Sequence, residues 1–208
     1  MKSKPLKRLV SLIFIMKKII NQDYRNYRWF FTSNNVLVVG GKSDSQNELV
    51  IRNFLKPDYI VMHTSAPGSS FMIIQSDKPT KKDLDETAIV CACFSQQWKE
   101  GKGKVDVDVF NGGQIYKIKS MKKGTFGVKG KKNVKKAELE LVLVIQKGKL
   151  RAVSSGTKEK KLAVIKPGKL TKEQAVDKIA KIIKDKFDFP ISKDEIMQAI
   201  PSDKLGVR

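Results

Sequence analysis

The segment from Lys117 to Lys136, KIKSMKKGTFGVKGKKNVKK, constrains the fold more than any other stretch of the chain. It carries nine lysines and no acidic residue, yet apolar residues lie between the lysines and glycines recur at 124, 127 and 130. A disordered basic tail is poor in apolar residues, so this mixture predicts strands joined by tight turns. A structured array of ammonium groups needs a polyanionic partner, and RNA is the leading candidate.

The composition of the whole chain agrees with a folded, basic protein. The 208 residues include 42 Lys and Arg against 21 Asp and Glu, which gives a formal charge of +21, and 40% are hydrophobic. That apolar fraction is enough for a core, and the length suits one domain or one domain with a small appendage. An acidic protein surface or an anionic membrane would also attract this charge, so both stay open as alternatives to RNA.

The cysteine content argues against a disulfide and against a zinc site. Cys91 and Cys93 are the only cysteines, and two positions apart on an expected helix they point to different faces. The chain has one histidine and no C-x-x-C pair, so the usual ligand set for structural zinc is missing. We therefore expect two reduced, half-buried thiols in a cytoplasmic protein, with no metal and no cofactor.

Residues 1–26 form a basic N-terminal extension. A charged start and the apolar run LVSLIFIM look like parts of a signal peptide, but Lys17 and Lys18 follow at once and no small-residue cleavage site is present. The run is also far short of the ~20 residues that a membrane span needs. We expect no membrane span, and an amphipathic helix, a core-packing segment or an upstream extension of a chain starting at Met16 all remain open. Secretion is the remaining alternative.

The pattern of apolar residues, caps and turns predicts an α+β fold with a mixed, largely antiparallel sheet, packed helices and a small C-terminal helical appendage. We expect one domain over 27–154, with a strand and helices over 155–208 packed on it. The expected strands are 27–32, 36–39, 59–63, 71–74, 105–110, 114–119, 138–145, 150–153 and 162–165, and the expected helices are 44–55, 83–98, one that begins after Thr171 and 192–199.

The sequence Gly40-Gly41-Lys42-Ser43 joins an expected strand to an expected helix. A full phosphate-binding loop needs a glycine where this chain has Val36, so nucleotide hydrolysis is not expected. The backbone N–H groups at the start of the helix, with Lys42 beside them, can still accept a nucleic-acid phosphate. The alternative is a plain turn between a strand and a helix.

Two further features raise the question of catalysis. His63 is followed by several hydroxyl residues, but no G-x-S-x-G elbow is present, so we expect a binding or loop-organising role. Asp106 and Asp108 alternate with valines, which places both on one strand face that we expect to be solvated. A metal-assisted nucleic-acid-processing enzyme that uses both aspartates and His63 is the alternative.

Five motifs in a fixed order resemble the NFACT-R domain, the predicted RNA-binding module of the NFACT family of ribosome-associated quality-control proteins, in its stand-alone form. They are RWFF at 28–31, GGKSDSQNE at 40–48, MHTSAPGS at 62–69, ACFS at 92–95 with Trp98, and GTFGVKGKKN at 124–133. The resemblance covers roughly 27–153. Many multidomain relatives carry Arg-Asp where this chain has Lys42-Ser43, and an aliphatic residue or Met at Gly127.

The resemblance implies a non-enzymatic protein that binds tRNA or ribosomal RNA in translation or ribosome-associated quality control, with the large ribosomal subunit as a candidate partner. An adaptor that binds an acidic protein or ribosomal surface stays open. The expected phosphate contacts are Lys42, Lys117, Lys119, Lys129, Lys131 and Lys132, and the expected sugar or base contacts are Asn47, His63 and Asn133.

Overall fold

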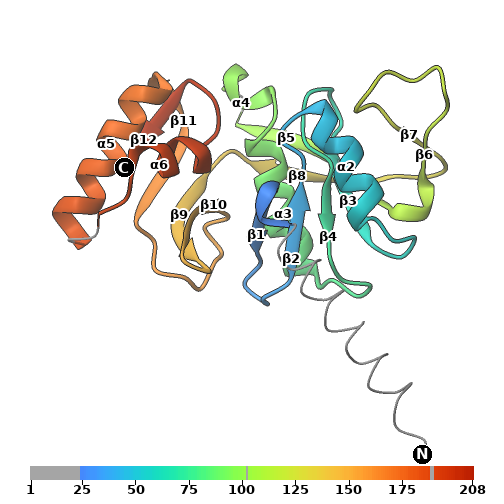
Figure 1. Cartoon of the computed structure of the whole chain (residues 1–208), viewed down its shortest axis with the longest axis horizontal. Helices are drawn as coiled ribbons and strands as arrows, with labels where there is room; N and C mark the ends of the chain where they lie inside the picture. Colours follow the sequence, from blue (N-terminus) through green and yellow to red (C-terminus); the bar gives the residue numbers. More distant parts are fainter. Residues whose placement is uncertain (1–23, 102, 188–189) are drawn as a thin grey trace, which may run out of the picture.

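The computed structural model describes residues 24–101, 103–187 and 190–208, and it confirms the α+β prediction. The strands form sheets of six, four and two strands, and every strand pairing in these ranges is antiparallel. The six-stranded and four-stranded sheets lie side by side, with the small two-stranded sheet at the far end (Figure 1). The expected N-terminal extension falls outside the described residues, apart from the short 3-10 helix η1 (Tyr24–Asn26).

The six-stranded sheet has a core cluster on each of its two faces. Its strands, in spatial order, are β1 (Arg28–Phe31), β2 (Leu37–Gly40), β4 (Met72–Ile74), β3 (Ile60–Thr64), β5 (Lys104–Asn111) and β8 (Asn133–Glu138). Successive side chains alternate between the faces, so Val38 belongs to one core cluster and Val39 to the other. Helix α3 (Lys81–Cys93) belongs to the first cluster and helix α2 (Asp44–Phe54) to the second.

The helix predictions are right for α2 and wrong at both ends of α3. Ser43 caps α2, since its Oγ accepts a hydrogen bond from the Gln46 N–H at 3.3 Å. Helix α3 begins at Lys81 because Thr80 and Asp83 form the capping box, and Asp83 is thus its third residue rather than its cap. It ends at Cys93, and a separate short helix, α4 (Gln97–Glu100), follows.

The C-terminal part is a four-stranded sheet covered by two helices. Its strands, in spatial order, are β10 (Lys149–Val153), β9 (Leu141–Gln146), β11 (Ala163–Leu170) and β12 (Leu205–Val207), and its helices are α5 (Lys172–Phe187) and α6 (Lys193–Ala199). Ile179 and Ile183 of α5 are buried and join the same core cluster as α3. Strand β12 was not predicted.

One side chain forms hydrogen bonds with the backbone at the outer edge of the larger sheet. Gln146 at the end of β9 accepts a hydrogen bond from the Phe31 N–H and donates one to the Phe31 carbonyl, both at 2.8 Å. The amide therefore gives the backbone N–H and carbonyl of Phe31, at the edge of β1, the partners that a neighbouring strand would provide. This contact ties the two sheets together across 115 residues of sequence.

The lysine-rich stretch folds into strands and turns, as its glycines indicated. After the 3-10 helix η2 (Gly112–Gln114) come the two-residue strands β6 (Ile115–Tyr116) and β7 (Gly127–Val128), and the stretch then runs into β8. Of the strand expected over 114–119, only the two residues of β6 form a strand. Strand β8 was not predicted. Cys91 and Cys93 are fully buried rather than half-buried. No helix in the described ranges is long and apolar enough to cross a membrane.

Candidate nucleic-acid interface

Glu48 of α2 anchors the lysine-rich stretch. Its carboxylate forms an ion pair with Lys117 and accepts a hydrogen bond from the Gly124 N–H at 2.8 Å. The Lys117 ammonium also donates to the carbonyls of Lys122 and Thr125, at 3.0 and 3.1 Å. The hydrogen bond from Lys117 is the main cause that lowers the pKa of Glu48. The structure therefore places Lys117, one of the expected phosphate contacts, in a clamp that holds a turn.

Gly124 allows the stretch to approach the start of α2. Its φ is +77°, and a Cβ on this residue would lie 2.5 Å from the Cβ of Asp44. Any other L residue would be strained by its backbone and would also collide with the helix. The turn is thus packed against the N-terminus of α2, just after Lys42.

Asp108 is buried, and the expectation that it lies on a solvated strand face is wrong. Its side chain forms an ion pair with Lys132 and accepts a hydrogen bond from the Ser65 Oγ at 2.6 Å, and only 7% of the residue is exposed. Asp106, two residues earlier, is exposed and lies opposite Lys136 in the register of β5 and β8. Buried carboxylates need partners, and here Lys132 and Ser65 provide them.

His63 lies directly across the sheet from Asp108, so these two residues are brought together as the enzyme alternative requires. Its Nδ1 donates to the Thr64 carbonyl at 2.7 Å, and burial lowers its pKa, which leaves the ring neutral near pH 7. The Ser65 hydroxyl bonds to Asp108 rather than to the imidazole. No group of three or more potential metal ligands occurs within the described ranges.

The other expected phosphate contacts in the stretch face solvent. Lys119, Lys129 and Lys131 are exposed and form no ion pair with any described residue. The Lys129 ammonium lies 5.1 Å from the Tyr116 ring centroid. Gln114 donates to the carbonyls of Lys129 and Lys131, at 2.8 and 2.9 Å, which fixes the backbone that carries both side chains.

The two expected asparagine contacts have different surroundings. Asn133 is exposed at the first position of β8. Asn47 is only 6% exposed, and its Oδ1 accepts a hydrogen bond from the Phe71 N–H at 3.5 Å. A Cβ on Gly41 would lie 2.3 Å from that same oxygen, so the turn before α2 packs tightly on Asn47.

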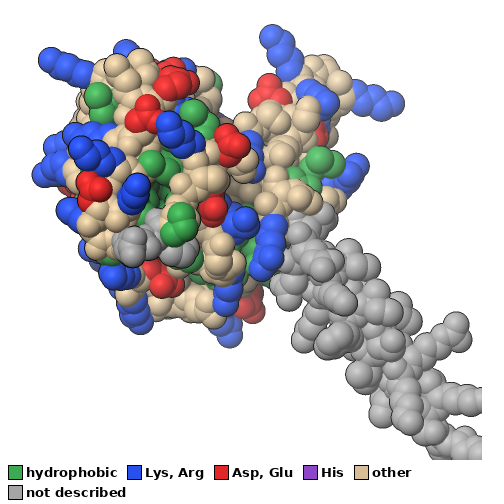
Figure 2. Space-filling view, turned by 60° about the vertical axis from the view of Figure 1, so that its left-hand side comes forward, with side chains coloured by type: hydrophobic (Ala, Val, Ile, Leu, Met, Phe, Trp, Pro, Cys, Tyr) green, Lys and Arg blue, Asp and Glu red, His purple; other side chains and the backbone are tan. Residues whose placement is uncertain are grey.

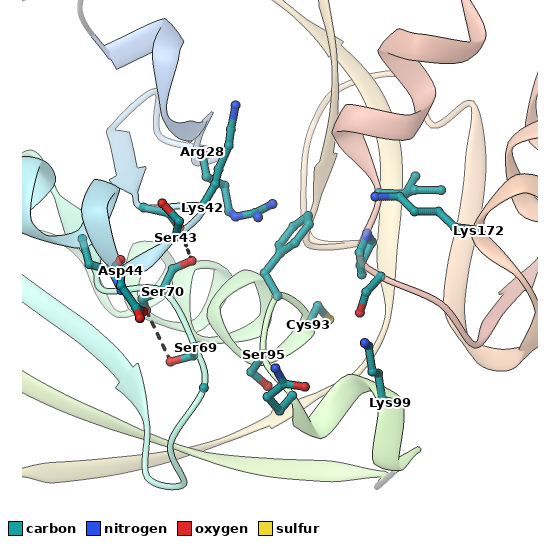
Figure 3. A pocket seen from close by; sticks show the side chains of 18 residues that line it. Arg28, Lys42, Ser43, Asp44, Ser69, Ser70, Cys93, Ser95, Lys99 and Lys172 are labelled. Atoms are coloured by element: carbon teal, nitrogen blue, oxygen red, sulfur yellow. Dashed lines mark hydrogen bonds between the residues drawn. The ribbon is translucent and has the colours of Figure 1, made fainter. Parts of the chain in front are cut away.

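A cleft of about 400 Å³ opens at the N-terminus of α2, and four cationic side chains line it. Arg28 and Lys42 come from one side of this cleft, and Lys99 and Lys172 come from the other (Figure 3). These residues belong to β1, the turn after β2, α4 and the first position of α5. Asp44 is the one carboxylate among the lining residues. We call this site the cationic cleft.

The cations of the cleft are held close together at an electrostatic cost. Burial lowers the pKa of Arg28 to about 10, and repulsion from Arg151 acts in the same direction. The pKa values of Lys42 and Lys172 are lowered as well, first by burial and then by the charge of Arg28. The Arg28 guanidinium lies 3.6 Å from the centroid of the Phe94 ring, and its buried Nε has no hydrogen-bond partner among the described residues.

Sequence reasoning found only Lys42 of these four cations. Arg28 stands in a recognised motif but was not assigned a role, and Lys99 and Lys172 belong to no motif. Arg28 and Lys172 are 144 positions apart in the sequence, so only the tertiary fold brings the four cations together. Lysine and arginine side chains project all around the outline of the face in Figure 2, with acidic side chains between them. Exposure of basic residues therefore does not by itself mark the cleft.

The comparisons with known proteins define the family. A family model described as the NFACT protein RNA binding domain matches residues 26–130, and the chain therefore belongs to the NFACT-R family. The chain is 29% identical over 203 residues to the archaeal Rqc2 homolog aRqcH of Methanocaldococcus jannaschii. This alignment covers 89% of this chain and 30% of that protein. It is 29% identical over 133 residues to the ribosome quality control complex subunit NEMF homolog of Drosophila melanogaster, covering 61% of this chain and 13% of that protein.

The human ribosome quality control complex subunit NEMF is 28% identical over 98 residues, which is 45% of this chain and 9% of that protein. The chain thus spans less than a third of the length of each of these relatives. The match to the family model ends before the C-terminal sheet and its helices begin. Lys172 therefore adds to the cleft from a part of the chain that lies outside that match.

Proposed function

We propose that this chain is a non-enzymatic RNA-binding protein that holds RNA phosphates in the cationic cleft. One observation carries the proposal: the cleft gathers Arg28, Lys42, Lys99 and Lys172 with a single carboxylate among its lining residues. Like charges in a shared, partly buried site repel each other, and a polyanion relieves that repulsion. The N-terminus of α2 adds the positive end of the helix dipole.

The exposed lysines of the 117–136 stretch extend the proposed surface. Lys119, Lys129 and Lys131 form no ion pair in the described ranges, and they are available to contact further phosphates. Lys117 and Lys132 act instead by fixing the turn and the strand that present the others. Such contacts position an RNA without reading its sequence.

The proposed setting is ribosome-associated quality control in the cytoplasm, with tRNA or ribosomal RNA as the ligand. Membership of the NFACT-R family and similarity to proteins named as ribosome quality control subunits support this setting. A structured RNA on the large ribosomal subunit is the class of partner that fits a surface of fixed, sequence-independent phosphate contacts.

The test is the salt dependence of binding to a stem-loop RNA. We expect log K to fall steeply with log salt, since each phosphate contact contributes roughly 0.7 to 0.9 to the slope. Changing Lys42, Lys99 and Lys172 together to Gln should reduce the magnitude of the slope by about 2 to 3. A matched triple variant at Lys158, Lys178 and Lys181, which are exposed and form no ion pair with a described residue, controls for net charge.

Two results would contradict the proposal. A nearly flat dependence on salt would exclude phosphate contacts as the basis of binding. Equal losses in the cleft variant and in the control variant would mean that net charge, not the cleft, attracts the RNA. Association with ribosomal particles that survives nuclease treatment would favour the adaptor alternative.

A further inference from the structure

A second open cavity of about 440 Å³ adjoins the cationic cleft, and it differs from the cleft in chemistry. Its walls combine polar residues with an apolar and aromatic part that includes Phe71, Phe110, Phe126 and Val128. It lies between β3, β5 and the turn that carries Gly124. The two sites share four lining residues, namely Asp44, Asn47, Gly68 and Ser69, so they are neighbours across one wall. We call this second site the aromatic cavity.

Stacked rings hold the shape of the aromatic cavity. The His63 and Phe71 rings lie with centroids 4.6 Å apart and planes inclined by 38°, and Phe126 meets Phe71 edge to face at 5.4 Å. Phe71 and Phe110 are 6% and 4% exposed, whereas Phe126 and His63 are half-buried. Packed aromatic neighbours restrict ring motion, so the two half-buried rings offer π surfaces that need little further ordering.

Fixed polar groups line the same cavity. Asp108 is held by Ser65 and Lys132, and all three residues line it. Because the Thr64 carbonyl can only accept a hydrogen bond, the neutral His63 ring carries its proton on Nδ1 and its lone pair on Nε2. The cavity therefore combines aromatic surface with acceptor and donor groups of defined position.

We infer that the aromatic cavity takes one unstacked RNA base while the flanking phosphates lie in the cationic cleft. This inference rests on the proposed function and adds a preference for unpaired nucleotides. A base presents a π face for rings and polar edges for hydrogen bonds, and its backbone carries the anion, so neighbouring aromatic and cationic sites match the two parts of one nucleotide. Bases in loops and bulges are free to leave the stack, whereas paired bases are not.

The turn between β6 and β7 completes this arrangement. Gly124, Thr125, Phe126 and Val128 line the aromatic cavity, and Glu48 fixes the same turn to α2. The clamp between Glu48 and Lys117 thereby holds one wall of the aromatic cavity to α2, and the N-terminus of the same helix lines the cationic cleft.

The test uses three versions of one stem-loop RNA: fully paired in the stem, with a single-nucleotide 2-aminopurine bulge, and with an abasic residue in that bulge. Stacking of one base on an aromatic side chain corresponds to roughly tenfold in affinity. We expect the bulged RNA to bind about tenfold more tightly than both other versions, and we expect the fluorescence of the 2-aminopurine to change on binding. Phe126→Tyr should retain the preference and Phe126→Ala should remove it.

Because Phe126→Ala also loosens the packing of the turn, a second variant fills the cavity without removing a packed side chain. Thr125 is exposed and lines the cavity, so Thr125→Trp should abolish the preference for the bulged RNA. Ser155→Trp, at an exposed position that lines neither site, is the matched control and should keep the preference.

Each outcome decides between the two proposals. If the protein binds all three RNAs equally and with a steep salt dependence, the base cavity is wrong and the phosphate proposal stands. If the abasic bulge binds as tightly as the intact bulge, the protein reads the bent backbone and the inference also fails. If none of the RNAs binds, both proposals fail together.

Discussion

Removing the charge of Glu48 should release the turn that forms one wall of the aromatic cavity. The Glu48 carboxylate accepts from the Lys117 ammonium and from the Gly124 N–H, and both bonds are charge-assisted in the native protein. Glu48→Gln keeps the size and shape of the side chain but removes the charge. A hydrogen bond to a charged group contributes about 1.5 to 3 kcal/mol and a neutral one about 0.5 to 1.5 kcal/mol.

The exposure of the pair reduces this difference. The side chains of Glu48 and Lys117 are 28% and 31% exposed, so water screens part of the attraction. We therefore expect the closed turn to lose about 1.4 kcal/mol, which corresponds to a tenfold increase in the population of the open turn. Hydrogen exchange at the Gly124 amide measures this directly, because that amide is one of the two donors.

The exchange rate of Gly124 should rise about tenfold, while the amides of β5 keep their rates. Glu159→Gln, at an exposed glutamate without an ion pair to any described residue, is the control.

The pH dependence of the Gly124 exchange rate gives an independent check. Since the pKa of Glu48 is lowered in the folded protein, its stabilisation is present above the unfolded pKa and is lost as the pH falls through the folded pKa. Unchanged exchange at Gly124, or equal acceleration in β5, would refute the clamp.

Two further predictions test the local structure. Burial raises the pKa of Cys91 to about 12 and also raises the pKa of Cys93. Neither thiol should therefore react with an aromatic disulfide reagent near pH 8 until the protein is unfolded. Rapid reaction in the native state would contradict their burial. Ser43→Ala should lower the free energy of unfolding by about 1 kcal/mol in a urea titration, because it removes the cap of α2. Ser45→Ala, within the first turn of the helix, is the control and should not lower it. Equal free energies of unfolding for both variants would exclude the cap.

The elements that local signals specify were predicted well. The pairing of β1 with β2 follows from two β-prone runs around a polar turn, and α2 follows from Ser43 before a helical pattern. Strand β8 was not placed because its residues are mostly exposed and rich in lysine, so they lack the alternation of apolar and polar residues that marks a strand. It is an edge strand, and charged side chains on an edge hinder pairing with other chains. Its sequence is thus explained by its position in the sheet, which local patterns do not give.

The candidate site was harder to predict because its charges depend on partners that are distant in sequence. Lys117 and Lys132 look like Lys129 and Lys131 in the sequence, yet the first two face Glu48 and Asp108. No spacing rule distinguishes a lysine that meets a carboxylate 69 residues away from one that meets solvent. Whether the expected residues contact RNA stays a prediction for the binding experiments above.

Part of the charge of the lysine-rich stretch therefore stabilises the fold and is not free for a ligand. Several of its lysines stabilise the fold: Lys117 clamps a turn, Lys132 pairs with a buried carboxylate, and Lys135 pairs with Asp85 of α3. By contrast, the fold gathers four other cations in one cleft, namely Arg28, Lys42, Lys99 and Lys172. In a protein with a surplus of positive charge, a site is better marked by cations that the fold gathers in one cleft than by the density of lysine along the chain.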